Sequence, residues 1–321
     1  MLNTKLDISV IICAYTEERW NDLVAAVESI ERQHAQAREI IVVIDHNPGL
    51  LARVRASMPS VIAEENKEAR GISGARNSGV AVAQGAVMAF IDDDVIATPD
   101  WLENLYAGYA DPRVVGIGGA IEPLWPSNRP AWFPLEFDWV VGCVYQGMPQ
   151  VTAPVRNLIG ANMSFRRQVF EKVGGFRLGK VGTRSRPEET ELCIRTHQQW
   201  PEGFWLYEPR ARVSHRVPAS RTSWRYFLIR CYNEGLGKAA MVHYVGSNDG
   251  LSAERAYTFK TLPHGIGRGI GDTFLRGKPA GLARAGAIVA GLTVTAVAYL
   301  IGVVLLRLKG NRLTGNQVNP I

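Results

Sequence analysis

The chain has 321 residues, which suits one large domain or one domain with a small appendage. Hydrophobic residues make up 46% and charged residues 21%, so the composition excludes a disordered chain and is sufficient for a buried core. The net charge of +6 suits a polyanionic ligand or an anionic membrane surface, and it is too small to indicate a nucleic-acid partner. The four scattered cysteines include no CxxC pair, which argues against a zinc site or a disulfide framework.

The first half of the chain alternates apolar runs with segments of helical periodicity. We predict strands at residues 8–14, 40–44, 61–63, 87–91 and 114–121, of which 8–14, 40–44 and 87–91 read as buried. Helices are predicted at 20–32, 48–58, 73–83 and 99–109, with Ser73 capping the third and Thr98 the fourth. This alternation predicts a parallel, doubly wound α/β sheet. Ligands of such sheets bind beyond the carboxyl ends of the strands, where this chain gathers acidic side chains.

The second half is less regular. Residues 123–154 are rich in Pro and Trp and predict an irregular loop, whose tryptophans either stack on a sugar ring or anchor packing. A strand is predicted at 157–165 and helices at 167–173, 188–199 and 223–241, the last amphipathic and partly basic. Residues 258–284 form a Gly-rich basic stretch that suits a membrane surface.

One apolar run near the C-terminus stands out. Residues 285–306 carry no charge, and at about 1.5 Å per residue they would span about 33 Å, enough for a bilayer core of about 30 Å. Arg284 precedes the run, and Arg307, Lys309 and Arg312 follow it. We predict a membrane-spanning helix; the alternative is a helix buried in a protein core.

Acidic residues follow two of the predicted strands. Asp92, Asp93 and Asp94 come directly after an apolar strand, and three adjacent carboxylates repel one another unless a cation compensates. Asp92 and Asp94 face the same way in an extended chain and suit Mg²⁺ or Mn²⁺ on a diphosphate. The alternative is an acidic turn that caps the next helix. Asp45 ends the second strand, where it either accepts a bond from a base N–H or forms a turn.

Two further segments are candidates for the site. Residues 70–79 (RGISGARNSG) combine small residues with a helix start, which favours a phosphate that Arg70 or Arg76 could hold. A small-residue helix packed closely on a sheet explains the same pattern. Glu188, Glu189 and Glu191 begin a helix, where acidic residues also complement the helix dipole.

Together these motifs resemble glycosyltransferase family 2, the inverting enzymes with the GT-A fold, and the chain is similar to membrane-associated bacterial-type members. The resemblance covers residues 8–218. It rests on the strand that runs into the motif AYTEE at 14–18, the Asp after the second strand, the Gly-Ala-Arg-Asn segment at 74–77, and the apolar strand that ends in the Asp triplet. The motifs GANMSF at 160–165, GGF at 174–176 and EETELCIR at 188–195 complete the order.

The resemblance implies a role for each matching position. The nucleotide-sugar pocket would include the residues Ala14, Tyr15, Thr16, Glu18, Asp45, Arg70, Arg76, Asp92 and Asp93. Asp94 would bind a divalent metal, Mn²⁺ or Mg²⁺, with Asp92 and His215 as further ligands. Glu189 would be the general base that deprotonates the acceptor hydroxyl. The chain departs from the family pattern at Asp45, which His46 follows where a second acid is usual, and at Glu189, where Asp is usual.

The expected protein is therefore a hexosyltransferase of polysaccharide biosynthesis that uses a nucleotide-sugar, with a UDP-sugar favoured. We expect a three-layer α/β/α GT-A domain at 1–240, a basic amphipathic interfacial segment at 241–283, a transmembrane helix at 284–307 and a short tail at 308–321. The expected partners are the nucleotide-sugar, a glycan or lipid-linked acceptor and membrane lipids, with no nucleic acid. We expect the protein at the cell membrane with its catalytic domain facing the cytoplasm.

Three alternatives remain open on sequence grounds. A polyprenyl phosphate is the alternative acceptor, and its phosphate would need little help from Glu189. A nucleotidyltransferase would also need a metal and carboxylates, and it would release pyrophosphate. A catalytically inactive membrane protein that binds glycans would tolerate the loss of Asp94.

Overall fold

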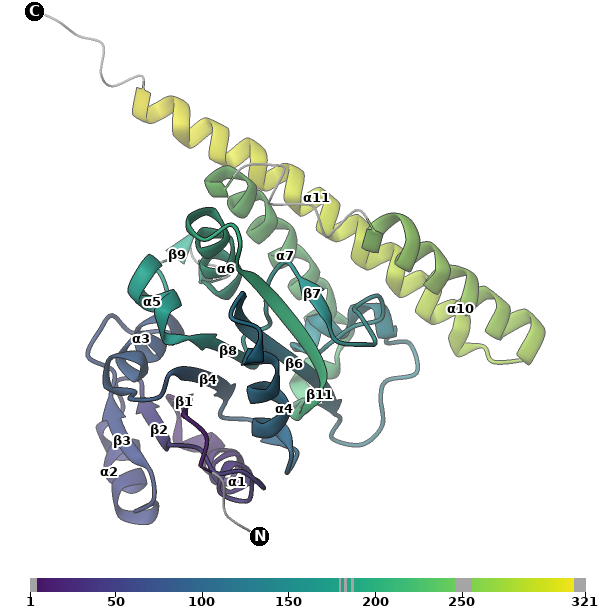
Figure 1. Ribbon diagram of the computed structural model, residues 1–321. Helices are drawn as coiled ribbons and strands as arrows, with labels where there is room; N and C mark the ends of the chain where they lie inside the picture. The colour runs from purple at the N-terminus through teal and green to yellow at the C-terminus, as the bar shows by residue number, and fades with distance from the viewer. Residues whose placement is uncertain (1–4, 179, 182–183, 186–187, 246–255, 315–321) are drawn as a thin grey trace, which may run out of the picture.

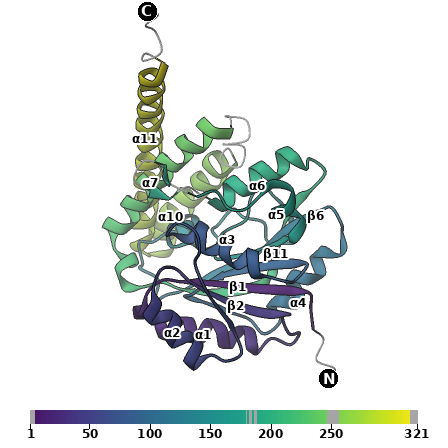
Figure 2. The ribbon, with the colours of Figure 1, turned by 90° about the vertical axis from the view of Figure 1, so that its left-hand side faces the viewer.

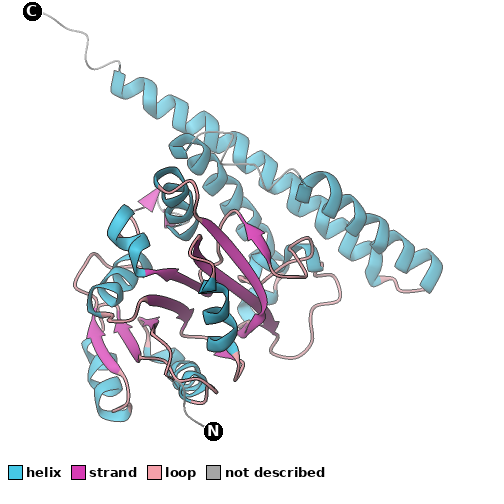
Figure 3. Ribbon diagram, in the orientation of Figure 1, coloured by secondary structure: helices cyan, strands magenta, loops and turns pink. Residues whose placement is uncertain are grey.

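The structure is a computed structural model that describes residues 5–178, 180–181, 184–185, 188–245 and 256–314. A nine-stranded sheet forms its centre, with helices on both faces (Figure 3). The strands of this sheet are β1 (Ile8–Ala14), β2 (Glu39–Ile44), β3 (Ile62–Glu65), β4 (Val87–Asp92), β5 (Val95–Ala97), β6 (Val114–Leu124), β7 (Ala153–Val155), β8 (Asn162–Arg166) and β11 (Phe204–Arg216). A separate two-stranded sheet is formed by β9 (Lys180–Val181) and β10 (Arg184–Ser185).

The sheet is covered by the helices α1 (Trp20–Glu31), α2 (Pro48–Ser57), α3 (Ile72–Val82), α4 (Trp101–Ala107), α5 (Arg167–Val173) and α6 (Glu188–Gln199). Successive residues of the central strands point to opposite faces. In β1, Val10 and Ile12 join the core under α1, α2 and α4, whereas Ile11 joins the core under α3, α5 and α6. This alternation produces three layers, which Figure 2 shows with α1 and α2 below the sheet and α3 above it.

The strand order is β3-β2-β1-β4-β8-β6-β11-β5, with β7 added to β11. The first part, from β3 to β4, is parallel as predicted. The expectation of a wholly parallel sheet is wrong, because β8 runs antiparallel to both β4 and β6. The long connection after β6 returns to the edge at which β6 ended, so β8 starts there, with Asn162 opposite Ile91, and runs the other way.

Several element boundaries differ from the sequence prediction. The helix expected at 73–83 begins at Ile72, and its cap is Gly71 (φ 131°) and not Ser73. The helix expected at 99–109 shortens to α4 and continues as the 3-10 turn η2 (Gly108–Ala110). The loop at 123–154 contains a 3-10 helix, η3 (Leu135–Val141), and the strand expected at 157–165 is only β8.

The C-terminal part begins with α7 (Trp224–Val245), followed by the π-helical turn η5 (Tyr257–Thr261), α10 (Leu262–Arg276) and α11 (Ala280–Thr314). Residues 246–255 of the predicted interfacial segment and 315–321 of the predicted tail lie outside the described residues. In Figure 1, α11 lies along one side of the molecule, with α10 beside its first half and α7 beside its middle. Glycines permit close contact: a Cβ on Gly235 of α7 would lie 2.3 Å from the carbonyl oxygen of Thr295, and one on Gly302 would lie 2.6 Å from Ala239 Cβ.

The stretch Ala280–Leu308 of α11 is long and apolar enough to cross a membrane. Only 22% of its most apolar 18-residue window is buried inside the protein, whereas a core helix would be mostly buried. The alternative of a core helix is therefore disfavoured, and the helix is a candidate membrane helix. It begins before the predicted span, because residues 280–283 continue the helix toward α10.

Candidate active site

A cavity of about 1070 Å³ collects most of the predicted site residues. One part of it lies at the carboxyl ends of β1, β2 and β4, where Ala14, Asp45 and Asp92 line it. Glu189 at the start of α6 and His215 near the end of β11 line the same cavity. The sheet topology therefore gathers side chains that are far apart in the chain.

The acidic triplet does not stay extended beyond Asp92, which ends β4. Asp93 and Asp94 lie in the turn before β5. The turn separates the two side chains that an extended chain would align: Asp92 faces Arg76, with Oδ1 3.6 Å from Nη2, whereas Asp94 faces His215. The prediction that Asp92 and Asp94 point the same way is therefore wrong.

Arg19 supplies the positive charge that this turn requires. Its Nη1 lies 2.9 Å from Asp93 Oδ1 and 3.2 Å from Asp94 Oδ2. Burial raises the pKa of Asp93 to about 6 even with Arg19 beside it. Burial also acts to raise the pKa of Asp94, but His215 and Arg19 outweigh it and hold that pKa below its usual value.

Asp94 and His215 supply a donor pair of the kind that divalent metals use. His215 Nε2 lies 3.2 Å from Asp94 Oδ1, and both side chains are buried. Within the described residues, Asp94 Oδ1 and Asp93 Oδ2 are buried oxygens without a hydrogen-bond partner. The described part of the chain contains no group of three His, Cys, Asp or Glu side chains arranged to hold a metal. The donor set thus fits a metal that takes its remaining oxygen ligands from a bound diphosphate.

Arg76 links the acidic turn to the start of α6. It is buried in α3, and its guanidinium lies 3.3 Å from Glu188 Oε1 and donates to the carbonyl of Gly160 at 3.2 Å. The same group faces Asp92 and lies 5.4 Å from the ring centre of Phe176. Arg76 is therefore a fixed positive charge between two acidic groups at the cavity wall.

Glu189 is the neighbour of the carboxyl that Arg76 holds. It lies in the first turn of α6 and lines the cavity. Removal from water raises the pKa of Glu189 to about 7, the charge of Glu188 adds to the rise, and Arg76 opposes it. A carboxyl group that titrates near neutral pH is suited to accept a proton from a hydroxyl group.

Asp45 organises the loop before α3. Its Oδ1 accepts from Asn66 Nδ2 at 2.6 Å and its Oδ2 from the N–H of Gly71 at 2.9 Å. His46 lies beside it, with Nδ1 2.8 Å from Oδ1. Asp45 therefore braces the backbone that faces the cavity, and the second lone pair of its Oδ2 can still accept from a ligand.

Not every predicted residue reaches the cavity. Thr16, Glu18 and Arg70 are not among the described residues that line it. Thr16 instead accepts a hydrogen bond from the N–H of Glu18 and caps η1 (Glu17–Arg19), and Arg70 is exposed. Tyr15 lines the cavity and is 51% exposed, so it lies at the rim.

The structure also adds residues that the sequence prediction missed. The additional charged residues that line the cavity are Arg19, Arg156, Arg221, Arg230, Glu234 and Lys238. Arg19 comes directly after the AYTEE motif at the end of the first strand, and this position could have identified it as a site residue from the sequence. The others come from irregular segments and from α7, and no local motif marked them.

The chain matches the model of glycosyl transferase family 2 over residues 9–174. A glucosyl-dolichyl phosphate glucuronosyltransferase of Haloferax volcanii is 36% identical over 243 residues, which are 74% of this chain and 77% of the relative. A succinoglycan biosynthesis protein, ExoM, of Rhizobium meliloti is 24% identical over 73% of this chain and 75% of its own length.

A solved structure with a similar fold is a mannosyltransferase from Pyrobaculum calidifontis in complex with GDP-Man and Mn²⁺. Its TM-score is 0.59 at 15% identity, and the match covers 92% of this chain and 87% of that one. Such a likeness establishes the GT-A fold alone.

Proposed function

This chain belongs to glycosyl transferase family 2 and is a glycosyltransferase, and we propose that it is an inverting hexosyltransferase that uses a UDP-sugar. The acceptor is a hydroxyl group of a lipid-linked sugar or glycan. The observation that carries the proposal is that Asp45, Arg76, Asp94 and Glu189 line one cavity at the carboxyl edge of the sheet. Donor-binding, diphosphate-binding and proton-accepting groups thus meet where an α/β sheet places its ligand.

In this proposal the donor lies along the edge formed by β1, β2 and β4. Tyr15 and Asp45 receive the base, and the helix start at Gly71 and Arg76 faces the phosphates. Asp45 can receive a uracil base because the free lone pair of its Oδ2 can accept from the base N–H, a donor that thymine and guanine also offer. The family resemblance supports the same assignment.

Asp94 and His215 would hold a divalent metal. Asp92, the third predicted ligand, lines the same cavity but faces Arg76. A bound Mn²⁺ or Mg²⁺ would neutralise charge on the leaving diphosphate. The unpartnered buried oxygens of Asp93 and Asp94 support this assignment, because they cost free energy unless a cation or donor compensates. The Mn²⁺ in the Pyrobaculum calidifontis structure supports it as well.

The chemical step follows from the position of Glu189. The acceptor hydroxyl attacks the anomeric carbon from the side opposite the diphosphate, so the configuration inverts. The new carbon–oxygen bond forms as the bond to the diphosphate breaks, Glu189 takes the hydroxyl proton, and the nucleoside diphosphate leaves. Arg76 holds Glu188 and Asp92 in place beside the reacting groups and takes no part in the proton transfer.

A membrane is the proposed setting. The name of the Haloferax volcanii relative includes a dolichyl phosphate, and α11 carries an exposed apolar surface. Nucleotide sugars are cytosolic, so the catalytic domain would face the cytoplasm. The helix α10 would lie at the membrane surface, because its Phe274 and Leu275 are 74% and 87% exposed among basic residues.

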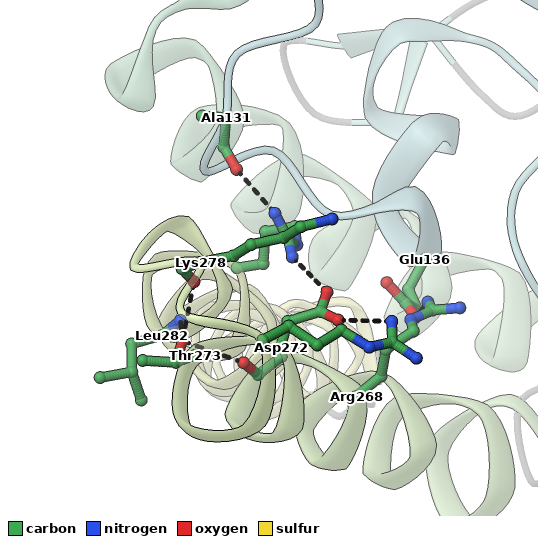
Figure 4. A network of polar contacts seen from close by, with 10 residues as sticks. Ala131, Glu136, Arg268, Asp272, Thr273, Lys278 and Leu282 are labelled. Atoms are coloured by element: carbon green, nitrogen blue, oxygen red, sulfur yellow. Dashed lines mark hydrogen bonds and ion pairs between the residues drawn. The ribbon is translucent and has the colours of Figure 1, made fainter.

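The hairpin of α10 and α11 is tied firmly to the catalytic domain (Figure 4). Arg268 of α10 pairs with the buried Glu136, and Arg284 of α11 donates to the carbonyl of Ala131. Asp272 joins the two helices, because its Oδ2 accepts from Arg284 at 2.7 Å. These contacts would hold the cavity at a fixed height relative to the bilayer.

The experiment is release of nucleoside diphosphate from UDP-, GDP- and TDP-sugars, with membranes present, with Mn²⁺, Mg²⁺ or a chelator. We expect release from a UDP-sugar that requires metal and is lost in Asp94→Ala. Release of a sugar 1-phosphate in place of the nucleoside diphosphate would indicate a nucleotidyltransferase. Folded protein that binds and cleaves no donor would overturn the transferase proposal and leave a glycan-binding protein.

A further inference from the structure

A second group of charged side chains lines the cavity where α7 and α11 form its wall. Arg230, Glu234 and Lys238 follow one another at intervals of four residues, so they share one face of α7. Arg156, which follows β7, lines the cavity as well. None of these residues belongs to the acidic turn or the loop before α3.

This group carries more positive than negative charge. Lys238 Nζ lies 3.0 Å from Glu234 Oε1. Burial acts to raise the pKa of Glu234, but the charges of Lys238, Arg230 and Arg156 outweigh it and lower that pKa. Because three cations surround one carboxylate, the group as a whole is positively charged and attracts an anionic ligand.

Arg230 also has an unused donor. Its Nε is buried and has no hydrogen-bond partner among the described residues. A buried donor without an acceptor is unfavourable, and a ligand oxygen would remove that cost. A guanidinium and an ammonium group that line the same cavity can both bind the oxygens of a phosphate group.

The α11 side of this part of the cavity is largely apolar, with Thr295 and Tyr299 also lining it. Leu292, Ala296 and Leu300 of α11 line it, and Leu300 is also 63% exposed, so it belongs both to the cavity and to the outer surface. The neighbouring Val297 and Val304 are about half exposed on the same helix, at 49% and 55%. An apolar chain that leaves the cavity past Leu300 therefore meets a continuous apolar helix surface.

We infer that the α7–α11 part of the cavity is the acceptor subsite, and that it binds the phosphate of a sugar linked to a long-chain lipid. Arg230 and Lys238 donate to the phosphate, Glu234 orients Lys238, and the lipid chain lies against Leu292 and Leu300 of α11. The sugar then extends toward Glu189. The inference rests on the proposed function and specifies the acceptor of that same cavity.

Three acceptors separate the contributions of phosphate and lipid. They are a glucosyl phosphate ester of a long-chain alcohol, the alkyl glucoside of equal chain length, and glucose 1-phosphate, each tested at several concentrations in mixed micelles. For wild-type protein we expect the highest kcat/KM with the ester. For Arg230→Gln we expect the ratio of kcat/KM for the ester to that for the glucoside to fall about tenfold or more, as loss of a charge-assisted hydrogen bond implies.

Arg225→Gln is the matched control, because Arg225 lies on the same helix, is exposed and does not line the cavity. It should keep the wild-type ratio. An unchanged ratio in folded Arg230→Gln, or an equal loss of kcat/KM with the ester and with the glucoside, would overturn the phosphate assignment. Equal use of ester and glucose 1-phosphate would overturn the lipid part. Absence of nucleoside diphosphate release with every acceptor would instead count against the proposed function.

Discussion

Arg76 joins two acidic groups that are far apart in the sequence, Asp92 at the end of β4 and Glu188 at the start of α6. Its guanidinium is almost fully buried, so the pairing fixes the position of α6 relative to the sheet. The adjacent Glu189 thereby reaches the cavity. A single residue of α3 thus connects the stability of the domain with the placement of the proposed base.

Replacement of Arg76 tests this connection. Arg76→Gln would leave Glu188 and Asp92 without their counter-charge, and breaking such a buried pair costs about 3–5 kcal/mol of the free energy of unfolding. Urea denaturation in detergent measures the change. Arg113→Gln removes the exposed pair with Asp111 and should leave the unfolding midpoint as in wild type. Equal midpoints for the two variants would contradict the structural role of Arg76.

The pH dependence of the reaction tests Glu189. A base must be deprotonated, and burial raises the pKa of Glu189 to about 7, so kcat/KM should rise as the pH increases through about 7 and then level off. Glu189→Gln should lower kcat by about 10²–10⁴-fold and abolish this limb of the profile. Initial rates between about pH 5 and about pH 9 measure both effects. A variant that kept the pH limb would assign it to another group.

The site was predictable from sequence where a motif follows a strand directly. Ala14, Asp45, Arg76, Asp92 and Glu189 all line the cavity, because a strand end or helix start fixes the place of each. The assigned roles of these residues stay predictions.

The remaining site residues depended on tertiary structure. Arg230 reaches the cavity only through the packing of α7. Thr16, in contrast, was expected in the pocket, and its hydroxyl oxygen instead accepts from a local backbone N–H, which residue type alone could not decide.

At the scale of elements, the predicted strands and helices were confirmed in order through β6, except that the short strand β5 was not predicted. The strands β1, β2 and β4 are buried on both faces and read as continuous apolar runs. The direction of β8 was not predictable in this way, since direction depends on where a long loop returns and not on local composition. The helix α10 was also difficult to recognise from the sequence, because its segment LPHGIGRGIG is rich in glycine, which disfavours helix formation. Gly269 permits close contact with α11, where a Cβ on it would lie 2.6 Å from the carbonyl oxygen of Gly281, whereas a Cβ on Gly267 meets nothing within 4 Å.

Two glycines of α7 give a matched test of helix contact. A Cβ on Gly235 would lie 2.3 Å from the carbonyl oxygen of Thr295 in α11, whereas one on Gly237 meets nothing within 4 Å. Gly235→Ala should destabilise the protein by about 1–3 kcal/mol through overpacking. Gly237→Ala should stabilise it by up to about 1 kcal/mol through helix propensity. Thermal unfolding in detergent measures both, and effects of the same sign would contradict the packing of α7 on α11.

At the scale of the whole molecule, an apolar surface runs along the outside of α10 and α11. Its most exposed large side chains are Phe259, Phe274, Leu275, Leu300 and Leu308, all at least 57% exposed. A surface of this kind marks a contact site for another protein or for a membrane, and the proposed function assigns it to a membrane. The ties at Glu136 and Ala131 hold this surface against the domain (Figure 4).

Membrane fractionation tests that surface. Full-length protein should sediment with bilayers and resist extraction by high salt and by alkaline carbonate, because apolar contact with lipid is insensitive to ionic strength. Phe274→Ser combined with Leu275→Ser should weaken recovery in the membrane fraction only partly, since α11 remains. Complete release of the wild-type protein by salt would indicate attachment by charge alone.

The cavity wall shared with α11 has a kinetic consequence for the proposed acceptor. The nucleotide-sugar would arrive through water in three dimensions, whereas the lipid-linked acceptor would arrive by diffusion within a two-dimensional lipid layer. The rate would then follow the mole fraction of acceptor in the lipid and not its amount per volume of solution, so added inert lipid would slow the reaction by surface dilution. Because the product would remain in the same layer, it could pass to the next enzyme without crossing the aqueous phase.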